Sequence, residues 1–320
     1  MTRVARSINE PIEAGQFSAR GDTLLSLAAR NGNSEAVRLL MQEGAEVDAR
    51  TKYQATPLYI ACQENKPAVA KILLDSKAAV NNKDDGALTP LMVASHQGHT
   101  DCVKLLLSQK GIAVDVPSNE HNLTALLKAS YLGHEGVVRH LLDAGASVTH
   151  ADADGATALL LACRNGHGKC VRLLLKAKSD PNTVVNDASG GGSALHFACK
   201  IGNAECVKLL LGAKASPNTA ATAEGAVTPL HLACQGGHTE CARLLLEAKA
   251  LVEAPDKDGV PPMFYADASG HQATSKLLAS FGASRAHGND PSTVWGIPGT
   301  PGTKAKGDPT GGGMGGLSIW

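Results

Sequence analysis

Histidines, cysteines and a glutamate crowd the stretch TPLHLACQGGHTECARLLLEAKA, which runs from Thr228 to Ala250. A cysteine near a histidine could act as a nucleophile with its general base. The same residue types are also common ligands of zinc. A third interpretation is structural, because free cysteine often serves as a small buried packing residue. The rest of the chain decides among the three.

This stretch is one of eight similar copies. Two others are TPLMVASHQGHTDCVKLLLSQKG from Thr89 and TALLLACRNGHGKCVRLLLKAKS from Thr157, and weaker copies begin at Thr23 and Pro261. The apolar residues at the third place of the copies are separated by 33, 33, 35, 33, 36, 35 and 33 residues. A unit of this length buries its apolar faces only by stacking on neighbouring units. The third-place residues are Leu25, Leu58, Leu91, Leu126, Leu159, Leu195, Leu230 and Met263.

Each copy predicts two short helices. A Thr or Ser opens the first helix, where its hydroxyl can accept a hydrogen bond from a free backbone N–H. Pro57, Pro90 and Pro229 stand at the first helical position, which proline favours. A second helix with apolar residues at helical spacing follows, and a polar segment leads into the next copy. Glycines that can adopt the left-handed conformation end the first helix; they are Gly98, Gly133, Gly166, Gly202, Gly237 and Gly270.

The period near 33 residues and the Thr-Pro-Leu-His-x-Ala signature resemble the ankyrin repeat, from about Ala19 to Ala283. The resemblance implies an all-α ankyrin-repeat solenoid of about eight helix-turn-helix units with short β-hairpin-like loops. We expect a loosely ordered N-terminal segment over residues 1–18 and the repeat domain over residues 19–284. The tail over residues 285–320 is rich in Gly and Pro, so we expect it to be disordered.

The repeats change the interpretation of the cysteines and histidines. A nucleophile requires one special environment, whereas these residues recur in equivalent ones. We therefore predict packing roles for the cysteines, and the resemblance implies that the histidines form hydrogen bonds between repeats. We expect no enzyme activity, no catalytic residue, no metal and no cofactor. The cysteines occupy two repeat positions, one with Cys62, Cys163, Cys199 and Cys234 and the other with Cys102, Cys170, Cys206 and Cys241.

Charge and composition restrict the partners. Lys plus Arg and Asp plus Glu balance at 30 each, and aromatic residues make up only 3% of the chain. Nucleic-acid binders usually show a basic excess, so we expect neither nucleic-acid nor membrane binding. The first residues lack the apolar core of a signal peptide, and no apolar run is long enough to span a membrane. We expect a monomer in the reducing interior of the cell, in the cytoplasm or also in the nucleus.

Four repeats carry lysine after the second helix, where the ankyrin pattern normally has glycine. These lysines would adopt positive φ angles, at a cost of roughly 1 kcal/mol each. One interpretation is local capping, because a cation near a helix C-terminus is favourable. The alternative is a basic edge that docks an acidic partner. The lysines are Lys77, Lys178, Lys214 and Lys249.

The resemblance implies that a partner protein binds the hairpin tips and the exposed end of the first helix. We predict non-catalytic protein–protein recognition on this concave surface. The alternative is a substrate-recognition adaptor, for example in ubiquitination, whose tail recruits effector machinery. The partner's identity is not encoded in any motif. The predicted partner-binding residues are Tyr53, His96, Tyr131, Leu132, Arg164, Asn165, Lys200, Ile201 and Gln235.

Overall fold

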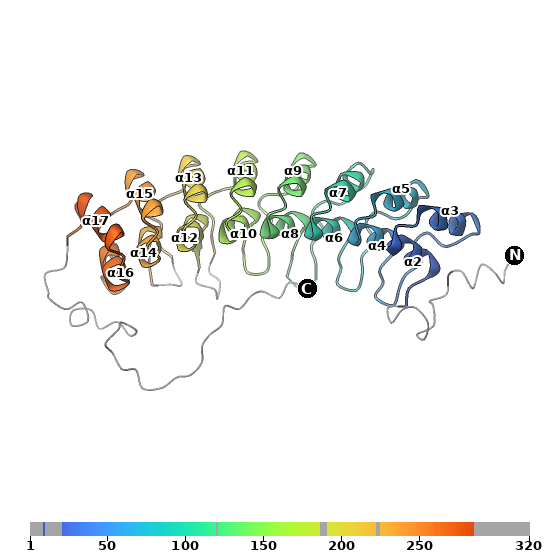
Figure 1. Ribbon diagram of the computed structural model, residues 1–320, viewed down its shortest axis with the longest axis horizontal. Coiled ribbons are helices and arrows are strands. Elements are labelled where there is room, and N and C mark those ends of the chain that lie inside the picture. The colour runs from blue at the N-terminus through green and yellow to red at the C-terminus, as the bar shows by residue number, and fades with distance from the viewer. Residues whose placement is uncertain (1–8, 10–20, 120, 186–190, 222–224, 285–320) are drawn as a thin grey trace, which may run out of the picture.

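The chain forms a row of stacked helix pairs that curves into an arch (Figure 1). The computed structural model describes residues 9, 21–119, 121–185, 191–221 and 225–284. Eight helix pairs lie within these residues, which confirms the predicted all-α solenoid. The N-terminal segment 1–18, apart from Asn9, and the tail 285–320 lie outside the described residues.

The helices form two layers. The first helices of the repeats line the inner side of the arch, and the second helices form its outer side (Figure 1). Each helix packs on its partner and on the matching helix of the next repeat. No helix among the described residues is long and apolar enough to cross a membrane. The first helices are α2 (Leu24–Asn31), α4 (Pro57–Gln63), α6 (Pro90–Gln97), α8 (Ala125–Leu132), α10 (Ala158–Arg164), α12 (Ala194–Lys200), α14 (Pro229–Gln235) and α16 (Pro262–Ala268). The second helices are α3 (Ser34–Gln42), α5 (Pro67–Asp75), α7 (Thr100–Leu107), α9 (Glu135–Asp143), α11 (Gly168–Lys176), α13 (Ala204–Gly212), α15 (Thr239–Glu247) and α17 (Gln272–Ser280).

The predicted caps open and close the first helices. In five repeats the opening threonine accepts a hydrogen bond from a backbone N–H three residues later, as from Tyr59 to Thr56 at 3.3 Å. Proline occupies the first turn of α4, α6 and α14, as predicted. The glycines predicted to end these helices all have positive φ, between 66° and 77°. The helix boundaries therefore follow from local capping chemistry.

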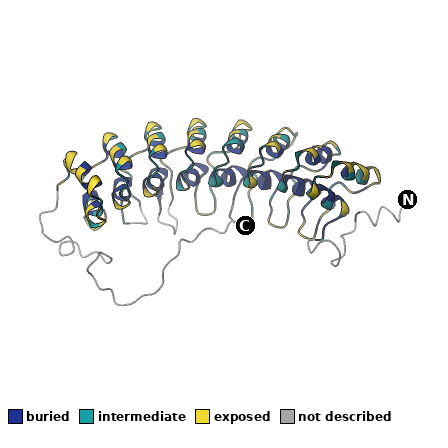
Figure 2. Ribbon diagram, viewed as in Figure 1, coloured by how far each residue is buried: buried dark blue, intermediate teal, exposed yellow. Residues whose placement is uncertain are grey.

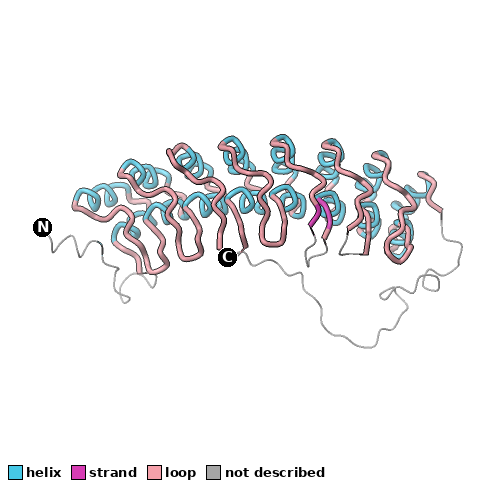
Figure 3. Tube along the Cα trace, turned by 180° about the vertical axis from the view of Figure 1, so that it is seen from behind, coloured by secondary structure: helices cyan, strands magenta, loops and turns pink. Residues whose placement is uncertain are grey.

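Loops project from the inner layer toward one side of the array (Figure 3). The loop before α12 pairs β1 (Val184–Val185) with β2 (Gly192–Ser193) in an antiparallel ladder. Others turn around an aspartate, such as Asp152, whose Oδ1 accepts from the N–H groups of Asp154 at 3.0 Å and Ala156 at 2.7 Å. These loops and the first helices together bound the concave surface.

The core runs the length of the array between the two layers (Figure 2). The third-place residues are all buried, from Leu25 to Met263. The first helices are buried over most of their length, whereas the second helices expose one face along the outer side (Figure 2). Each inner helix therefore packs against the first helices of the neighbouring repeats, and these neighbours position its side chains.

The four lysines after the second helices adopt the left-handed conformation. Their φ angles are 70° at Lys77, 65° at Lys178, 67° at Lys214 and 66° at Lys249. The equivalent glycines at Gly44, Gly145 and Gly282 have φ angles of 88°, 83° and 94°. The backbone at this position is thus set by the repeat and not by the residue that occupies it.

Candidate functional site

Histidines at the start of the second helices connect adjacent repeats. His167 Nε2 lies 2.9 Å from the backbone carbonyl oxygen of Tyr131 in the preceding repeat, and His134 Nε2 lies 2.8 Å from that of His96. Because a carbonyl only accepts, Nε2 carries the proton in both rings. His238 and His271 make the same contact at 3.3 and 3.1 Å. These distances confirm the predicted structural role of the histidines.

Each of these rings rests against the helix-ending glycine of the preceding repeat. A Cβ added at Gly133 would lie 2.5 Å from His167 Nδ1, closer than real Cβ contacts come. The glycine therefore has two functions: it allows a φ of 77° and it leaves space for the ring. We call this pair of contacts the glycine–histidine joint.

Two other histidines are buried within the first helices. His196 Nδ1 accepts the backbone N–H of Ser193 at 3.1 Å, and its Nε2 donates to the carbonyl oxygen of Val227 in the next repeat at 3.2 Å. His231 repeats the arrangement with Thr228 at 3.0 Å and Val260 at 3.1 Å. Burial lowers the pKa of His196 to about 4 and also lowers the pKa of His231. Both rings are therefore neutral structural ties at neutral pH.

The eight cysteines are free and buried. Burial raises the pKa of Cys234 to about 12 and the pKa values of Cys170 and Cys241 to about 11. Since the thiolate is the reactive form of cysteine, this environment disfavours nucleophilic chemistry at these three thiols. Hydrogen bonds with Cys62 and Cys163 lower the pKa values of Cys102 and Cys206, but both side chains are fully buried. Within the described residues, no group of three or more His, Cys, Asp or Glu side chains is arranged to hold a metal ion.

We predict that the cysteines react slowly with a thiol reagent while the chain is folded. Native protein at neutral pH should show little labelling over minutes, whereas all eight thiols should react after denaturation in guanidinium chloride. Mass spectrometry of the labelled protein reports the number and position of modified residues. Rapid native labelling of a single cysteine would contradict the packing role.

The predicted partner-binding residues cluster at the ends of successive first helices. Asn165, Lys200, Ile201 and Gln235 are exposed, and Ile201 keeps 45% of its surface accessible. The other helix-end residues are half-buried, so they contribute to the surface and to the packing of the repeats. These are His96 in α6, Tyr131 and Leu132 in α8, and Arg164 in α10.

Arg164 is fixed across a repeat boundary. Its guanidinium lies 4.7 Å from the ring centroid of Phe197, at the fifth place of the next repeat. Such a cation–π contact holds the side chain in one orientation. Phe197 is only 6% exposed, and the prediction from sequence did not include it.

Tyr131 faces the loops. Its side chain lines a narrow pocket with Leu161, Asp152 and Asp154, and this pocket has a volume of about 10 Å³. Such a volume holds about one water molecule, too little for an organic ligand.

Tyr53 lies apart from the row of helix ends. It sits in the loop before α4, is 51% exposed, and has the Lys52 ammonium 5.7 Å from its ring centroid. Its carbonyl oxygen accepts the N–H of Asp85 in the next loop at 3.2 Å. The predicted residues thus fall into two places, the helix ends and a loop tip.

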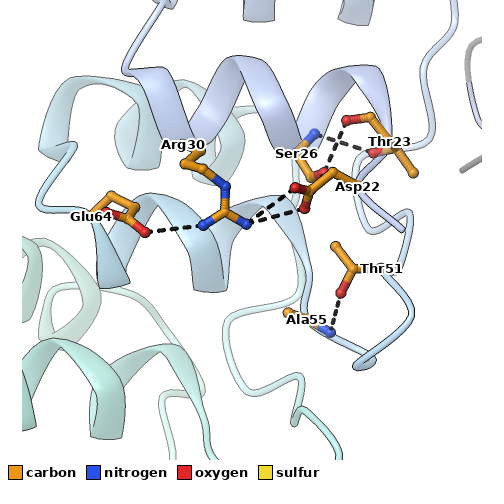
Figure 4. Close-up of polar contacts among 7 residues, drawn as sticks. All are labelled: Asp22, Thr23, Ser26, Arg30, Thr51, Ala55 and Glu64. Carbon is orange, nitrogen blue, oxygen red and sulfur yellow. Dashed lines mark hydrogen bonds and ion pairs between the residues drawn. The ribbon is translucent and has the colours of Figure 1, made fainter. Parts of the chain in front are cut away.

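Arg30 occupies the same repeat position as Tyr131 and Arg164 but is held in ion pairs. It lies 3.1 Å from Asp22 at the start of its own repeat and 3.1 Å from Glu64 in the next one (Figure 4). Asp22 also accepts from the Ser26 hydroxyl at 3.3 Å. Arg30 therefore ties the first two repeats together at this end of the concave surface.

Lys128 was not among the predicted site residues, although it departs from the repeat pattern. It takes the fifth place of its repeat, within α8, where the other first helices carry an aliphatic or aromatic residue. Its side chain is only 7% exposed. A single charged residue in an apolar column was the signal in the sequence that could have identified it.

Comparison with known proteins agrees with this architecture. The family described as "Ankyrin repeats (3 copies)" matches residues 4–85, 76–152, 146–221 and 196–289. The chain is also 25% identical over 165 residues to a "Transient receptor potential cation channel subfamily A member 1 homolog" from Caenorhabditis elegans. That match covers 52% of this chain and 11% of the relative, so the chain spans only a small part of that protein's length.

Proposed function

Because the chain belongs to the ankyrin repeat family, we propose that it is a non-catalytic recognition module whose protein partners bind the concave surface. Ankyrin repeats generally mediate protein–protein interaction, so the class of partner follows from the family. The site, the compartment and the oligomeric state are our proposals. We place the protein as a monomer inside the cell, in the cytoplasm or also in the nucleus, where free cysteines stay reduced.

The observation that carries this proposal is an exposed apolar residue, Ile201, at the end of the helix whose Phe197 fixes a cation of the preceding repeat. Ile201 and Lys200 follow one another at the end of α12, and Phe197 of the same helix contacts Arg164. Aromatic residues, Arg and apolar side chains held in place are typical of the residues that dominate binding energy. The repeat pattern requires none of these identities, which leaves them available for recognition.

The adaptor alternative depends on the tail over residues 285–320, which lie outside the described residues. No observation in the repeats favours it over simple recognition. We also extend no channel activity to this chain, since the match to the Caenorhabditis elegans relative covers 11% of that protein.

We expect Ile201→Glu to abolish capture of the protein partners from a lysate of the source cells. A charge placed at the centre of an interface should weaken binding by about thirtyfold or more. Ile201 is 45% exposed, so the substitution should change the unfolding free energy by only ~0.5 kcal/mol. Quantitative mass spectrometry of the captured proteins and a melting curve measure the two effects.

The matched control is Leu39→Glu. Leu39 is 54% exposed and lies on α3 in the outer layer, so it tests the same chemical change on the opposite side of the arch. The control should retain the partners. Loss of partners with Leu39→Glu and retention with Ile201→Glu would move the recognition surface to the outer layer.

A further inference from the structure

Lys128 stands in a column of apolar side chains on the concave face. In the other first helices the fifth place is occupied by Leu27, Ile60, Val93, Leu161, Phe197, Leu232 and Tyr265. The side chain of Lys128 is 93% removed from solvent, because only 7% of its surface is exposed. A lysine stem can lie along apolar surface, but its ammonium group requires water or an acceptor.

Asp84, the acidic group whose charge acts on Lys128, already accepts hydrogen bonds from its own loop. Asp84 Oδ1 accepts the N–H groups of Gly86 at 3.0 Å and Leu88 at 2.8 Å. The hydroxyl of Tyr59 also faces this carboxylate: burial, then the charge and a hydrogen bond of Asp84, raises the pKa of Tyr59. The carboxylate is therefore committed to its own loop and to the preceding repeat.

Within the described parts of the chain, the Lys128 ammonium has no hydrogen bond and no ion pair. Burial lowers its pKa, and the charge of Asp84 offsets this only in part. His96 of the preceding repeat is close enough that the charge of Lys128, after burial, lowers the His96 pKa. Lys128 Nζ is not among the fully buried polar atoms of the described residues that lack a partner, so the ammonium group still reaches solvent. The surroundings of Lys128 thus contain one occupied carboxylate and one half-buried imidazole, and no protein group among the described residues accepts its protons.

The chain gains no internal contact from this arrangement. The described residues offer the Lys128 ammonium no hydrogen bond or ion pair, and an apolar residue could fill the space that its stem occupies. Seven other repeats carry such an apolar residue at this place. A local departure of this kind, without an internal partner, is expected at functional positions.

We propose that Lys128 is the anchor for a single carboxylate side chain, Asp or Glu, from an extended acidic segment of a protein partner. The carboxylate takes the place of water at the Lys128 ammonium group, near His96 of the preceding repeat. This inference rests on the proposed function and adds the chemical class of the partner. It assigns the specificity to charge complementarity at one buried position of the concave surface.

The test uses the full chain and a displayed library of random twelve-residue peptides. We expect the selected peptides to contain an Asp or Glu whose change to Asn or Gln weakens binding about thirtyfold or more, measured by fluorescence polarisation with synthetic peptides. Lys128→Met should weaken binding of the acidic peptide by the same factor. Its affinity for the Asn or Gln version of the peptide should equal that of the wild type within about threefold. The exposed lysine of α13 provides the matched control, Lys208→Met, which should leave both affinities unchanged.

A melting curve separates recognition from folding. Lys128→Met should melt at or above the temperature of the wild type, because no hydrogen bond or ion pair is lost and methionine replaces the buried lysine stem. A clear drop in its melting temperature would identify Lys128 as a structural residue and overturn the proposal. Selection of binders without any acid dependence, or of no binders, would overturn it as well.

The outcomes also distinguish this inference from the proposed function. If Ile201→Glu abolishes peptide binding but Lys128→Met leaves it unchanged, recognition on the concave surface stands and the role of Lys128 is overturned. Peptides indifferent to both substitutions would overturn both.

Discussion

Gly133→Ala should destabilise the repeat array by about 2–4 kcal/mol, although it adds only one methyl group. The residue would keep a φ of 77°, which costs an alanine roughly 1 kcal/mol. The new Cβ would also lie 2.5 Å from His167 Nδ1, so the ring must move. Moving it breaks the 2.9 Å bond between His167 Nε2 and the Tyr131 carbonyl oxygen, which costs about 1–3 kcal/mol if the carbonyl is left without a donor.

Gly145→Ala in the same repeat is the matched control. Its φ is 83°, and no atom lies within 4 Å of an added Cβ. This variant should therefore lose only the unfolding free energy that the positive φ costs an alanine, roughly 1 kcal/mol. Gly270→Ala offers a second control, because it occupies the same repeat position as Gly133 and has no atom within 4 Å.

Urea titrations followed by circular dichroism give the unfolding free energies. A double-mutant cycle with His167→Ala isolates the joint, since in that background Gly133→Ala should cost no more than Gly145→Ala does. Equal losses for Gly133→Ala and Gly145→Ala in the wild-type background would show that the ring moves without penalty.

Acid should unfold the chain well before its surface carboxylates alone would predict. His196 is 1% exposed, and burial lowers its pKa to about 4 in the folded state. An unfolded histidine has a pKa of about 6.5, so between these two values the unfolded chain binds the extra proton. Stability is thus fully present above pH ~6.5 and falls as the pH drops toward 4, by ~3 kcal/mol from this residue.

Burial is the main reason why the proton is excluded, and the hydrogen bond at Nδ1 acts in the same direction. His196 Nδ1 accepts the N–H of Ser193, and a proton on Nδ1 would oppose that donor. His231 has the same arrangement with Thr228, and its pKa is lowered in the same direction. The two residues therefore act together on acid stability.

The measurement is the unfolding free energy at pH 7.5 and at pH 4.5 for the wild type and for His196→Leu. Leucine is a suitable replacement because Leu127 and Leu160 fill the equivalent place in other repeats. The variant should be less stable at pH 7.5, since it loses the bonds to Ser193 and Val227. It should also show a clearly smaller loss between the two pH values, and an unchanged loss would mean that His196 does not titrate in this range.

Most of the fold could be predicted because the same types of helix-capping and turn residues recur across the eight repeats. Threonine caps, first-turn prolines and helix-ending glycines such as Gly98 act within a few residues of the chain. The burial of the cysteines could also be predicted, because Cys62 and Cys102 represent two positions that recur at fixed places in the repeat. The repeat pattern is found by comparing the copies, so it identifies the residues and roles that the copies share.

The same comparison does not show the contacts that occur in only one or two of the copies. The stacking of Arg164 on Phe197 joins residues of different repeats, and its geometry depends on how each repeat rotates on the last. The absence of an acceptor at Lys128 depends on the bonds that Asp84 makes within its own loop. Such features require three-dimensional distances, and the sequence shows only that a residue departs from the pattern.

The stacking of the repeats also determines how the molecule would yield under mechanical load. Among the described residues, the closely packed helices lie either within one repeat or in adjacent repeats. Under tension along the arch, a terminal repeat would peel away at the cost of one set of neighbour contacts, while the remaining array stays folded. Such a chain lengthens in steps of one repeat, and the force at each step reports the strength of a single interface between neighbouring repeats.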